Sequence, residues 1–416
     1  MSRLIFHIDA NSAYLSWEAA YRLQRGEKLD LRTVPSVIGG DEESRHGIVL
    51  TKSIPAKKFN IKTGETLYNA RAKCPGLIIV PPRYSLYMKC SLAMNQIFQE
   101  YTPQIQRFSV DESFLDFSNM EHLYPDYMVL AETISERVKK ELGFTVNIGI
   151  SNNKLLAKVA SDFKKPDMIH TLFPHEIEKK MWPLPVEELF MVGRATAPKL
   201  HSLNINTIGE LANYDLELLK YKLKSHGQVI WNFANGIEFS EVRKSNYIEM
   251  KGIGNSTTIS FDVEDSDTAH KVLLSLCETV AMRLRDSQNC CTVVSVSIRG
   301  SDMISYSRQK KLEVATDSTR RIYEVICYLF DNVWKGNPIR HLGVHITDFC
   351  DNDFYQCYLL DNFNYEKDRE INKTVDAIRL KYGSGAIVKS CFLHSGLSAM
   401  CGGIGTDDYP LMSAML

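Results

Sequence analysis

The segment RFSVDESFLDF, residues 107–117, places two adjacent carboxylates, Asp111 and Glu112, within an apolar run typical of a β-strand. Neighbouring side chains of a strand point to opposite faces, so an interior position would force one acid into the core. A buried carboxylate without a partner takes up a proton or binds a cation. We therefore predict that both acids occupy the turn between two short antiparallel strands, although an ordinary solvated hairpin would explain the same residues.

Length and composition indicate a globular protein with several domains. The chain has 416 residues, of which 44% are hydrophobic and 24% are charged, and these values exclude a mainly disordered protein. The formal net charge is only −1. A polyanion such as DNA would therefore have to be bound by local clusters of Lys and Arg.

The cysteine pattern and the N-terminus favour a reducing cytoplasm. The ten cysteines form no CxxC pair, which is typical of reduced thiols rather than of a disulfide framework or a zinc site. The opening sequence MSRLIFHIDA lacks the apolar core of a signal peptide. Because no apolar run is long enough to span a bilayer, we expect no membrane association.

A third acid, Asp9, follows an apolar run over residues 4–8 that predicts a first strand. Asn11 can cap the helix that comes next, and Gly26 can end it. In this arrangement Asp9 lies at the edge of a sheet, although a role in capping the helix is an alternative.

The order of the elements predicts how these acids meet. Up to residue 170 the order is strand, helix, strand, strand, helix, strand, which builds one antiparallel sheet with helices on a single face. This topology brings Asp9 close to Asp111 and Glu112, and three converging carboxylates would repel each other without a bound metal ion. The expected elements include helices over residues 85–100, 128–142 and 152–163 and a strand over residues 145–150.

Two other segments could contact phosphate groups. Short strands over residues 34–38 and 47–51 precede a basic stretch that contains Lys57. A helix, turn, helix pattern over residues 182–214 surrounds Gly193 and could direct backbone N–H groups at a DNA phosphate. A solvated lysine face and an ordinary helical bundle would explain the same patterns.

A second sheet domain is predicted after a polar linker, residues 241–252. Its expected strands cover residues 256–262, 293–299, 311–314 and 343–349, and its helices cover residues 268–286 and 319–334. A local positive cluster consists of Arg299, Arg308, Lys310, Lys311, Arg320 and Arg321, although nearby acids offset its charge. A helix over residues 370–382 is expected in the remaining tail.

The chemistry that suits three such acids is phosphoryl transfer. Carboxylates around two divalent cations about 3.5 to 4 Å apart support in-line displacement at phosphorus. One cation lowers the pKa of the attacking hydroxyl, here a primer 3′ end, and the other neutralises the charge of a triphosphate.

Five motifs together carry a family resemblance: HIDANSAY, SVDESFLD, GISNNKLLAKVASDFKKP, MVGRATAPKL and KGIGNSTT. Over residues 3–350 the chain resembles the Y-family translesion DNA polymerases, in particular the branch of bacterial DNA polymerase IV and UmuC-like proteins. The resemblance implies an α+β fold shaped like a right hand. Its expected parts are a ferredoxin-like palm (residues 1–30 and 83–170), small fingers (31–82), a helix-hairpin-helix thumb (171–240), a linker (241–252), a little finger with a four-stranded sheet and two helices (253–350) and a C-terminal tail (351–416).

The resemblance also implies catalytic roles. Asp9, Asp111 and Glu112 would bind two Mg²⁺ ions, and Ala10 would contribute its backbone carbonyl. Tyr14 stands five positions after the first acid, where the family has an aromatic steric gate against the ribose 2′-OH.

The nucleotide triphosphate would contact Thr51, Lys57 and Lys165. Here the fingers depart from the family pattern, because IPAK at residues 54–57 replaces the usual Tyr-Glu-Ala-Arg. Lys57 offers a point charge without the bidentate fork of Arg.

Contacts to DNA and to a sliding clamp are implied as well. The expected DNA contacts are Gly193, Arg194, Ala195, Arg299, Arg308, Lys310 and Lys311. The expected clamp-binding residues are Gln356, Leu359 and Leu360, where relatives carry a Gln-x-x-Leu-aromatic peptide; an amphipathic segment packed on its own domain is the alternative.

The sequence thus predicts a monomeric, cytoplasmic, template-dependent DNA polymerase. It would add dNTPs to a primer with low fidelity and bypass lesions in DNA repair, using Mg²⁺, primer–template DNA and a sliding clamp. A catalytically silent DNA-binding or clamp-recruited scaffold and a metal-dependent phosphodiesterase are the alternatives.

Overall fold

The computed structural model describes residues 3–243, 250–352 and 365–401. They form two units, which are described separately. The first unit contains residues 3–40 and 48–243, and the second contains residues 41–47, 250–352 and 365–401. Within these described residues, none of the helices has the length and apolar character needed to cross a membrane.

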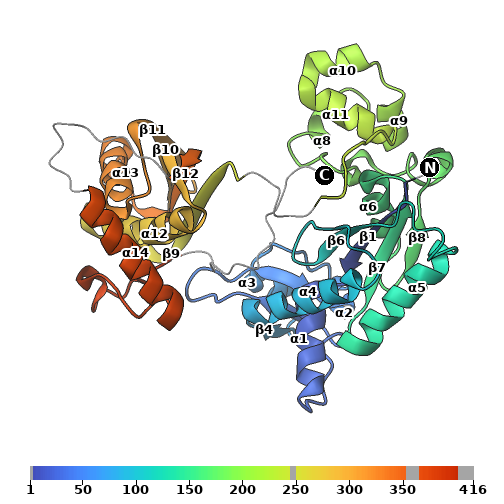
Figure 1. Ribbon diagram of the computed structural model, residues 1–416, viewed down its shortest axis with the longest axis horizontal. Helices are drawn as coiled ribbons and strands as arrows, with labels where there is room; N and C mark the ends of the chain where they lie inside the picture. Colours follow the sequence, from blue (N-terminus) through green and yellow to red (C-terminus); the bar gives the residue numbers. More distant parts are fainter. Residues whose placement is uncertain (1–2, 244–249, 353–364, 402–416) are drawn as a thin grey trace. The chain divides into compact units, whose positions relative to one another are not determined.

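The first unit is built on a sheet of five strands in the order β5-β6-β1-β7-β8 (Figure 1). The strands are β1 (Ile5–Ala10), β5 (Ile105–Arg107), β6 (Glu112–Asp116), β7 (Val146–Ser151) and β8 (Ile169–Thr171). β1 lies in the centre and runs antiparallel to β6 and β7. The prediction of a wholly antiparallel sheet is wrong at one edge, because β8 runs parallel to β7.

Helices cover both faces of this sheet, so the prediction that they share one face is also wrong. α4 (Tyr84–Gln99) and α5 (Tyr127–Arg137) cover one face, and α6 (Lys154–Asp162) covers the other. Helix α1 (Ala13–Gln24) follows β1 and packs on α4. α5 continues as a π-helical turn, Val138–Leu142, and ends at Gly143 with a left-handed backbone.

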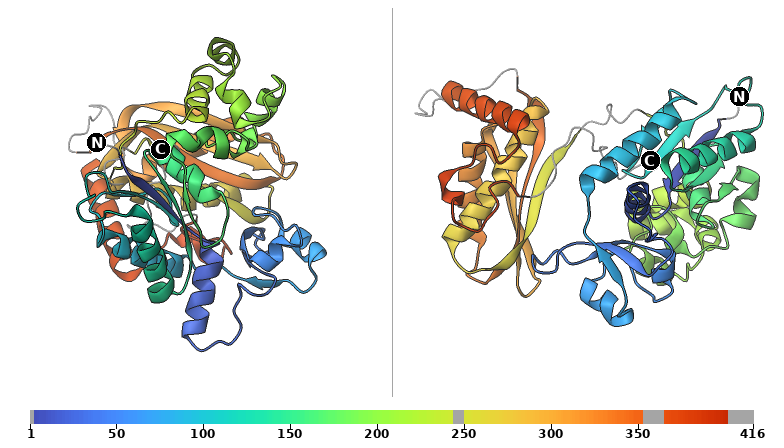
Figure 2. Two further views of the ribbon diagram at one scale, coloured as in Figure 1. Left: turned by 90° about the vertical axis from the view of Figure 1, so that its right-hand side faces the viewer. Right: turned by 90° about the horizontal axis from the view of Figure 1, so that it is seen from below.

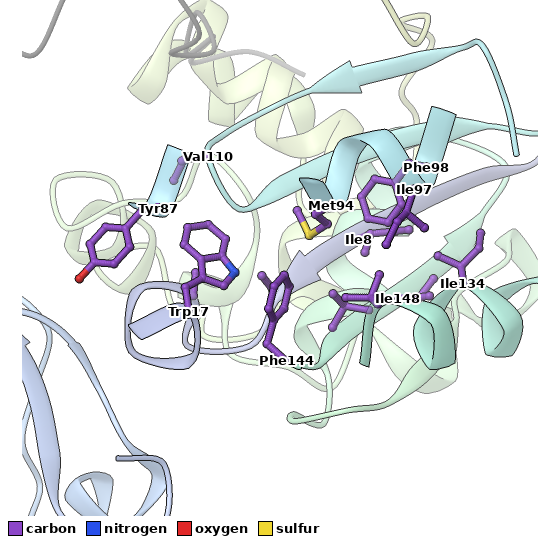
Figure 3. Packing of buried hydrophobic residues seen from close by; sticks show 14 of the residues in the cluster. Ile8, Trp17, Tyr87, Met94, Ile97, Phe98, Val110, Ile134, Phe144 and Ile148 are labelled. Carbon is purple, nitrogen blue, oxygen red and sulfur yellow. The ribbon is translucent and has the colours of Figure 1, made fainter. Parts of the chain in front are cut away.

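The alternating side chains of β1 explain the two covered faces. Phe6 and Ile8 point into an apolar cluster with α4 and α5, and Figure 3 shows Ile8 beside residues of these helices. His7 points to the opposite face, where its Nδ1 lies 2.7 Å from Oγ of Ser161 on α6. A strand that is buried on both sides cannot place Asp9 in bulk water.

Asn11 does not cap helix α1, contrary to our prediction. Ser12 precedes the helix with a left-handed backbone, and it makes no side-chain cap. Asn11 instead donates from Nδ2 to Oγ1 of Thr145, at 3.1 Å, and from its backbone N–H to the Thr145 carbonyl, at 3.0 Å. The chain that leaves β1 is therefore tied to the start of β7.

Residues 36–40 and 48–80 form a smaller layer with its own buried cluster. Its sheet has the order β3-β2-β4, and β2 and β4 are parallel. Its elements are β2 (Ser36–Gly39), β3 (Val49–Lys52), α2 (Ile54–Lys57), α3 (Leu67–Lys73) and β4 (Ile78–Val80).

Short helices follow β8 and share one buried cluster with α6. They are α7 (Ile177–Lys180), α8 (Ala197–His201), α9 (Ile208–Ala212), α10 (Leu216–Leu223) and α11 (Ser225–Ala234), with 3₁₀ turns at Pro174–Glu176 and Val186–Glu188. The predicted helical region after residue 171 thus packs directly on the helix that covers the central sheet.

The second unit has the predicted four strands and two helices, and the strands are longer than expected. The antiparallel order is β11-β10-β12-β9, and the helices lie on one side of the sheet (Figure 2). The elements are β9 (Gly252–Val263), α12 (Ser266–Asp286), β10 (Asn289–Gly300), β11 (Ser305–Thr316), α13 (Thr319–Val333) and β12 (Ile339–Asp351).

The C-terminal helix α14 (Tyr365–Tyr382) packs on α12. Arg285 on α12 forms an ion pair with Asp376 at 2.6 Å, and Arg379 forms a buried pair with Glu278 at 2.6 Å. The predicted helix over residues 370–382 is confirmed, and it belongs to the second unit rather than to a free tail.

Gly149 on β7 allows α6 to lie close against the sheet. A Cβ atom at this position would collide with the carbonyl oxygen of Ala157 and the amide nitrogen of Ser161, both on α6. These atoms belong to the backbone and cannot rotate away as the end of a side chain could.

We predict that Gly149→Ala lowers the free energy of unfolding by at least about 3 kcal/mol, because α6 must move off the sheet. Gly76→Ala is the matched control, since Gly76 has open space around it, and it should change stability by less than about 0.5 kcal/mol. Urea denaturation measures both. Equal stability of the two variants would contradict the close contact between β7 and α6.

Candidate active site

Two of the three predicted acids face each other across neighbouring strands. Asp9 on β1 and Glu112 on β6 are directly opposite in the antiparallel register. The backbone N–H of Ala10 donates to the Asp111 carbonyl at 3.0 Å. The structure therefore brings the C-terminal end of β1 and the two adjacent acids together at one end of the central strands.

The turn between β5 and β6 holds Asp111 as predicted, but the prediction that Glu112 also lies in the turn is wrong, because the ladder with β1 extends to this residue. Asp111 ends the turn and Glu112 begins β6. Ser109 organises the turn: its Oγ donates to Oδ1 of Asp111, at 2.6 Å, and accepts from the backbone N–H of Glu112, at 3.1 Å. The Ser109 N–H donates to the Glu112 carbonyl, also at 3.1 Å.

Each of the two facing carboxylates contacts a lysine from α6 or from the turn after it. Nζ of Lys158 lies 2.6 Å from Oε1 of Glu112. Lys165 forms an ion pair with Asp9 and a second one, at 2.8 Å, with Asp162. Two ammonium groups thus supply the positive charge that two partly buried carboxylates require.

Asn147 fixes the turn that carries Lys165. It lies opposite Asp9 on the other neighbouring strand, β7. Its Nδ2 donates to the carbonyls of Ser161, at 3.1 Å, and Lys164, at 2.9 Å. The row Glu112, Asp9 and Asn147 therefore crosses the sheet and meets α6 and its C-terminal turn.

Burial dominates the electrostatics of Asp9. It raises the pKa of this carboxyl to about 7, partly offset by Lys165 and reinforced by repulsion from Asp111 and Glu112. For Lys165, burial is outweighed by the carboxylates of Asp9 and Asp162, so its pKa lies above the ordinary value. The repulsion at Asp9 shows that the three acids interact.

The donor set suits a hard divalent cation, since carboxylate and carbonyl oxygens are the ligands that Mg²⁺ prefers. Among the described residues, no three His, Cys, Asp or Glu side chains are already grouped as metal ligands. Asp9 and Glu112 are instead paired with lysines. A cation that enters between them would add positive charge beside these ammonium groups.

Tyr14 is held rigidly in the first turn of α1. Its ring stacks on that of Tyr87, with centroids 4.6 Å apart and an angle of 11° between the planes. The rings of Tyr84 and Trp17 also pack on the Tyr14 ring, with centroid distances of 6.3 and 6.0 Å. Tyr87 is fully buried, so this stack fixes the plane of the half-buried Tyr14.

The predicted triphosphate contacts come from two layers. Thr51 lies on β3, opposite Ile38, and Lys57 is the exposed last residue of α2. Both belong to the smaller layer of residues 36–40 and 48–80, whereas Lys165 lies beside the acids of the central sheet. Lys57 also lies close enough to Lys52 to lower the pKa of that lysine, an effect second to burial.

Gly193, Arg194 and Ala195 form an exposed turn before α8. The Gly193 carbonyl accepts from the backbone N–H groups of Thr196, at 2.9 Å, and Ala197, at 3.0 Å. Apart from the neighbouring residues of the chain, no atom of the described residues lies within 4 Å of the place that a Cβ at Gly193 would take.

The pleat of the second sheet divides the predicted basic cluster. Arg308 and Lys310 lie opposite Val296 and Val294, whose side chains face the helices. Lys310 accordingly contacts the ring of Tyr328 on α13, at 4.9 Å. The alternating positions Arg299 and Lys311 lie on the opposite, open face.

The predicted clamp-binding residues Gln356, Leu359 and Leu360 lie outside the described residues. Three residues that do shape the site, Ser109, Asn147 and Lys158, received no role from the sequence. Lys158 is four positions after Lys154 on α6, and this helical spacing was the available signal that both face the sheet.

Family models match most of the chain. Residues 8–162 match the impB/mucB/samB family, residues 250–359 match the C-terminal domain of that family, and residues 174–205 match the IMS family HHH motif. The chain belongs to this family. Its predicted membership of the Y-family polymerases is thereby confirmed.

Curated relatives of this family are similar over nearly their whole length. A DNA polymerase IV of Clostridium acetobutylicum is 50% identical over 394 residues, which cover 95% of this chain and 99% of the relative. A DNA polymerase IV of Acetivibrio thermocellus is 37% identical over 398 residues, with 95% and 98% covered. Bacillus subtilis has a DNA polymerase IV 2 that is 36% identical over 398 residues, with 94% and 95% covered.

A solved Y-family DNA polymerase chimera has the same fold. It aligns with a TM-score of 0.71 and 21% sequence identity, and the match covers 84% of this chain and 100% of the chimera. The predicted α+β polymerase fold is therefore confirmed.

Lys154 is a buried cation beside this site. Its Nζ donates to Oε1 of Gln106 at 3.1 Å and lies 5.7 Å from the centre of the Phe114 ring. Burial lowers the pKa of Lys154 to about 8, and Glu238 partly offsets this effect. The folded protein therefore holds this proton more weakly than the unfolded chain does, whose lysines have a pKa near 10.5.

We predict that Lys154 makes stability increase with pH between about 8 and 10.5, because the unfolded chain binds more protons in this window. Relative to Lys154→Met, the wild type should gain up to about 1 kcal/mol per pH unit. Urea denaturation as a function of pH measures the difference. Lys139→Met is the control at an exposed lysine and should show no such gain; a constant difference between wild type and Lys154→Met would refute the assignment.

Proposed function

We propose that the protein is a template-dependent DNA polymerase that adds dNTPs to a primer 3′ end and copies damaged templates with low fidelity. The observation that carries this proposal is the pair Asp9 and Glu112, which face each other across β1 and β6 next to Asp111. The names of the curated relatives and the fold of the solved chimera support it.

Asp9, Asp111 and Glu112 would hold two Mg²⁺ ions together with the carbonyl of Ala10. When bound, such ions activate the primer hydroxyl and neutralise the triphosphate. The protein fixes the acids in advance: Asp9 is set by central strand β1 and Glu112 by the register between β1 and β6. Little reorganisation is then needed as charge develops at phosphorus.

Three residues would orient the incoming nucleotide from different sides. Thr51 and Lys57 would contact the triphosphate from the small sheet, and Lys165 would contact it from the turn after α6. Tyr14 would exclude ribonucleotides, because the stack on Tyr87 prevents its ring from moving away from a 2′-OH.

The second unit offers a surface that suits a sugar–phosphate backbone. Its sheet carries a hollow of about 540 Å³ with a floor of small residues from several strands. The small residues include Gly254, Ser256, Ser295, Ser297 and Gly343. Arg299 and Lys311 lie on this same face. In the first unit, the turn at Gly193 would contact a DNA phosphate through its backbone.

Clamp binding through Gln356, Leu359 and Leu360, a monomeric state and a cytoplasmic location complete the proposal. A peptide that tethers the enzyme to a clamp would raise its effective concentration at the primer end.

We predict that Glu112→Gln lowers the rate of primer extension by at least about a hundredfold, because a neutral amide cannot hold the divalent cation. Glu100→Gln is the matched control at an exposed glutamate paired with Arg137 and should retain the wild-type rate. A gel assay with labelled primer measures extension.

Normal extension by Glu112→Gln would exclude the proposed site. In the same assay, shortening of the primer by the wild type would indicate a nuclease, and an unchanged primer would indicate a scaffold.

Removal of the Tyr14 side chain tests the steric gate. Tyr14→Ala should lower discrimination against ribonucleotides by at least about tenfold, since the ring no longer excludes the 2′-OH. Tyr14→Phe keeps the ring and should keep the discrimination. The measurement is the ratio of kcat/KM for dNTP and rNTP; an unchanged ratio in Tyr14→Ala would refute the gate.

A further inference from the structure

The two lysines at the acids differ in how tightly they are held. Lys158 is 11% exposed, and its Nζ lies 5.1 Å from the centre of the Phe108 ring and 6.0 Å from that of Phe190. Lys165 is 31% exposed, and its second partner, Asp162, is 58% exposed. The ammonium group of Lys158 is enclosed by aromatic rings, whereas that of Lys165 can move towards solvent.

A charged Asp9 needs a cation beside it. Asp9 is buried on the central strand, and a charged carboxylate in such a place is stable only when it is paired. Lys165 provides this charge when no metal ion is bound. A divalent cation at Asp9 would repel the ammonium group of Lys165. The cation and the ammonium group therefore compete for the Asp9 carboxylate.

The position of Lys165 allows it to change partners without unfolding. Its turn is fixed by the hydrogen bonds from Asn147 to the carbonyls of Ser161 and Lys164. Only the flexible side chain needs to move, because these bonds hold the backbone. A triphosphate bound next to the metal site would offer such a displaced ammonium group another anionic partner.

We infer that Lys165 is an exchangeable counter-ion: it occupies Asp9 in the absence of metal and transfers to the triphosphate when a divalent cation takes its place. This inference rests on the proposed function and goes beyond a simple phosphate contact. The exchange makes metal binding and nucleotide binding cooperative. A bound cation releases Lys165 from Asp9 for the triphosphate, and a bound triphosphate draws Lys165 away from Asp9. Lys158 has the complementary role of a fixed counter-ion that stays near Glu112.

Replacement of Lys165 should therefore have opposite effects on the two ligands. In Lys165→Met, Mn²⁺ binding to the protein without DNA or nucleotide should become about three- to tenfold tighter, since a part-exposed competing ion pair is lost. The KM for dNTP in primer extension should increase at least about tenfold, since a charge-assisted contact is lost. Electron paramagnetic resonance of free Mn²⁺ measures the first effect.

Lys139→Met serves as the control, because Lys139 pairs with Asp167 at an exposed position and should leave both quantities unchanged. Lys165→Gln, compared by thermal unfolding, provides a second variant if Lys165→Met folds poorly. Equal or weaker Mn²⁺ binding by the Lys165 variants, or no Mn²⁺ binding by any of the proteins, would overturn the exchange. Primer extension by the wild type in the same series decides the proposed function independently.

Discussion

The site depends on one constraint: Asp9 and Glu112 lie directly opposite each other on the neighbouring strands β1 and β6. Both carboxylates lie on the face of the sheet that α6 covers, so neither is fully hydrated. Unpaired charges in such a place would cost several kcal/mol each. The structure meets this requirement with Lys158 and Lys165, which come from the covering helix and the turn after it.

The close contact of α6 with the sheet sets the positions of these lysines. Gly149 removes a side chain where the backbone of α6 approaches β7. His7 and Asn147 then join the sheet to α6 and its C-terminal turn through buried polar contacts. Helix α6 also shares a buried apolar cluster with the short helices that follow β8. A change in the packing of these short helices would therefore shift α6 and, with it, the lysines at the acids.

The sequence was informative wherever a local pattern decides the structure. The charged pair in an apolar run predicted the turn at Asp111, and the apolar run of residues 4–8 predicted the strand that carries Asp9. Contacts set by tertiary packing could not be predicted. Three-residue β8 carries too short a pattern to be recognised, the pairing of Lys158 with Glu112 depends on how α6 lies on the sheet, and the pleat separates basic residues that are neighbours in sequence.

Anomalous diffraction from Mn²⁺ tests the proposed site most directly, in crystals of the protein with primer–template DNA and an incoming nucleotide that cannot react. We expect two peaks between Asp9 and Glu112, with Lys165 displaced from Asp9 onto the triphosphate. Peaks elsewhere, or a Lys165 that still contacts Asp9 beside bound metal, would contradict it.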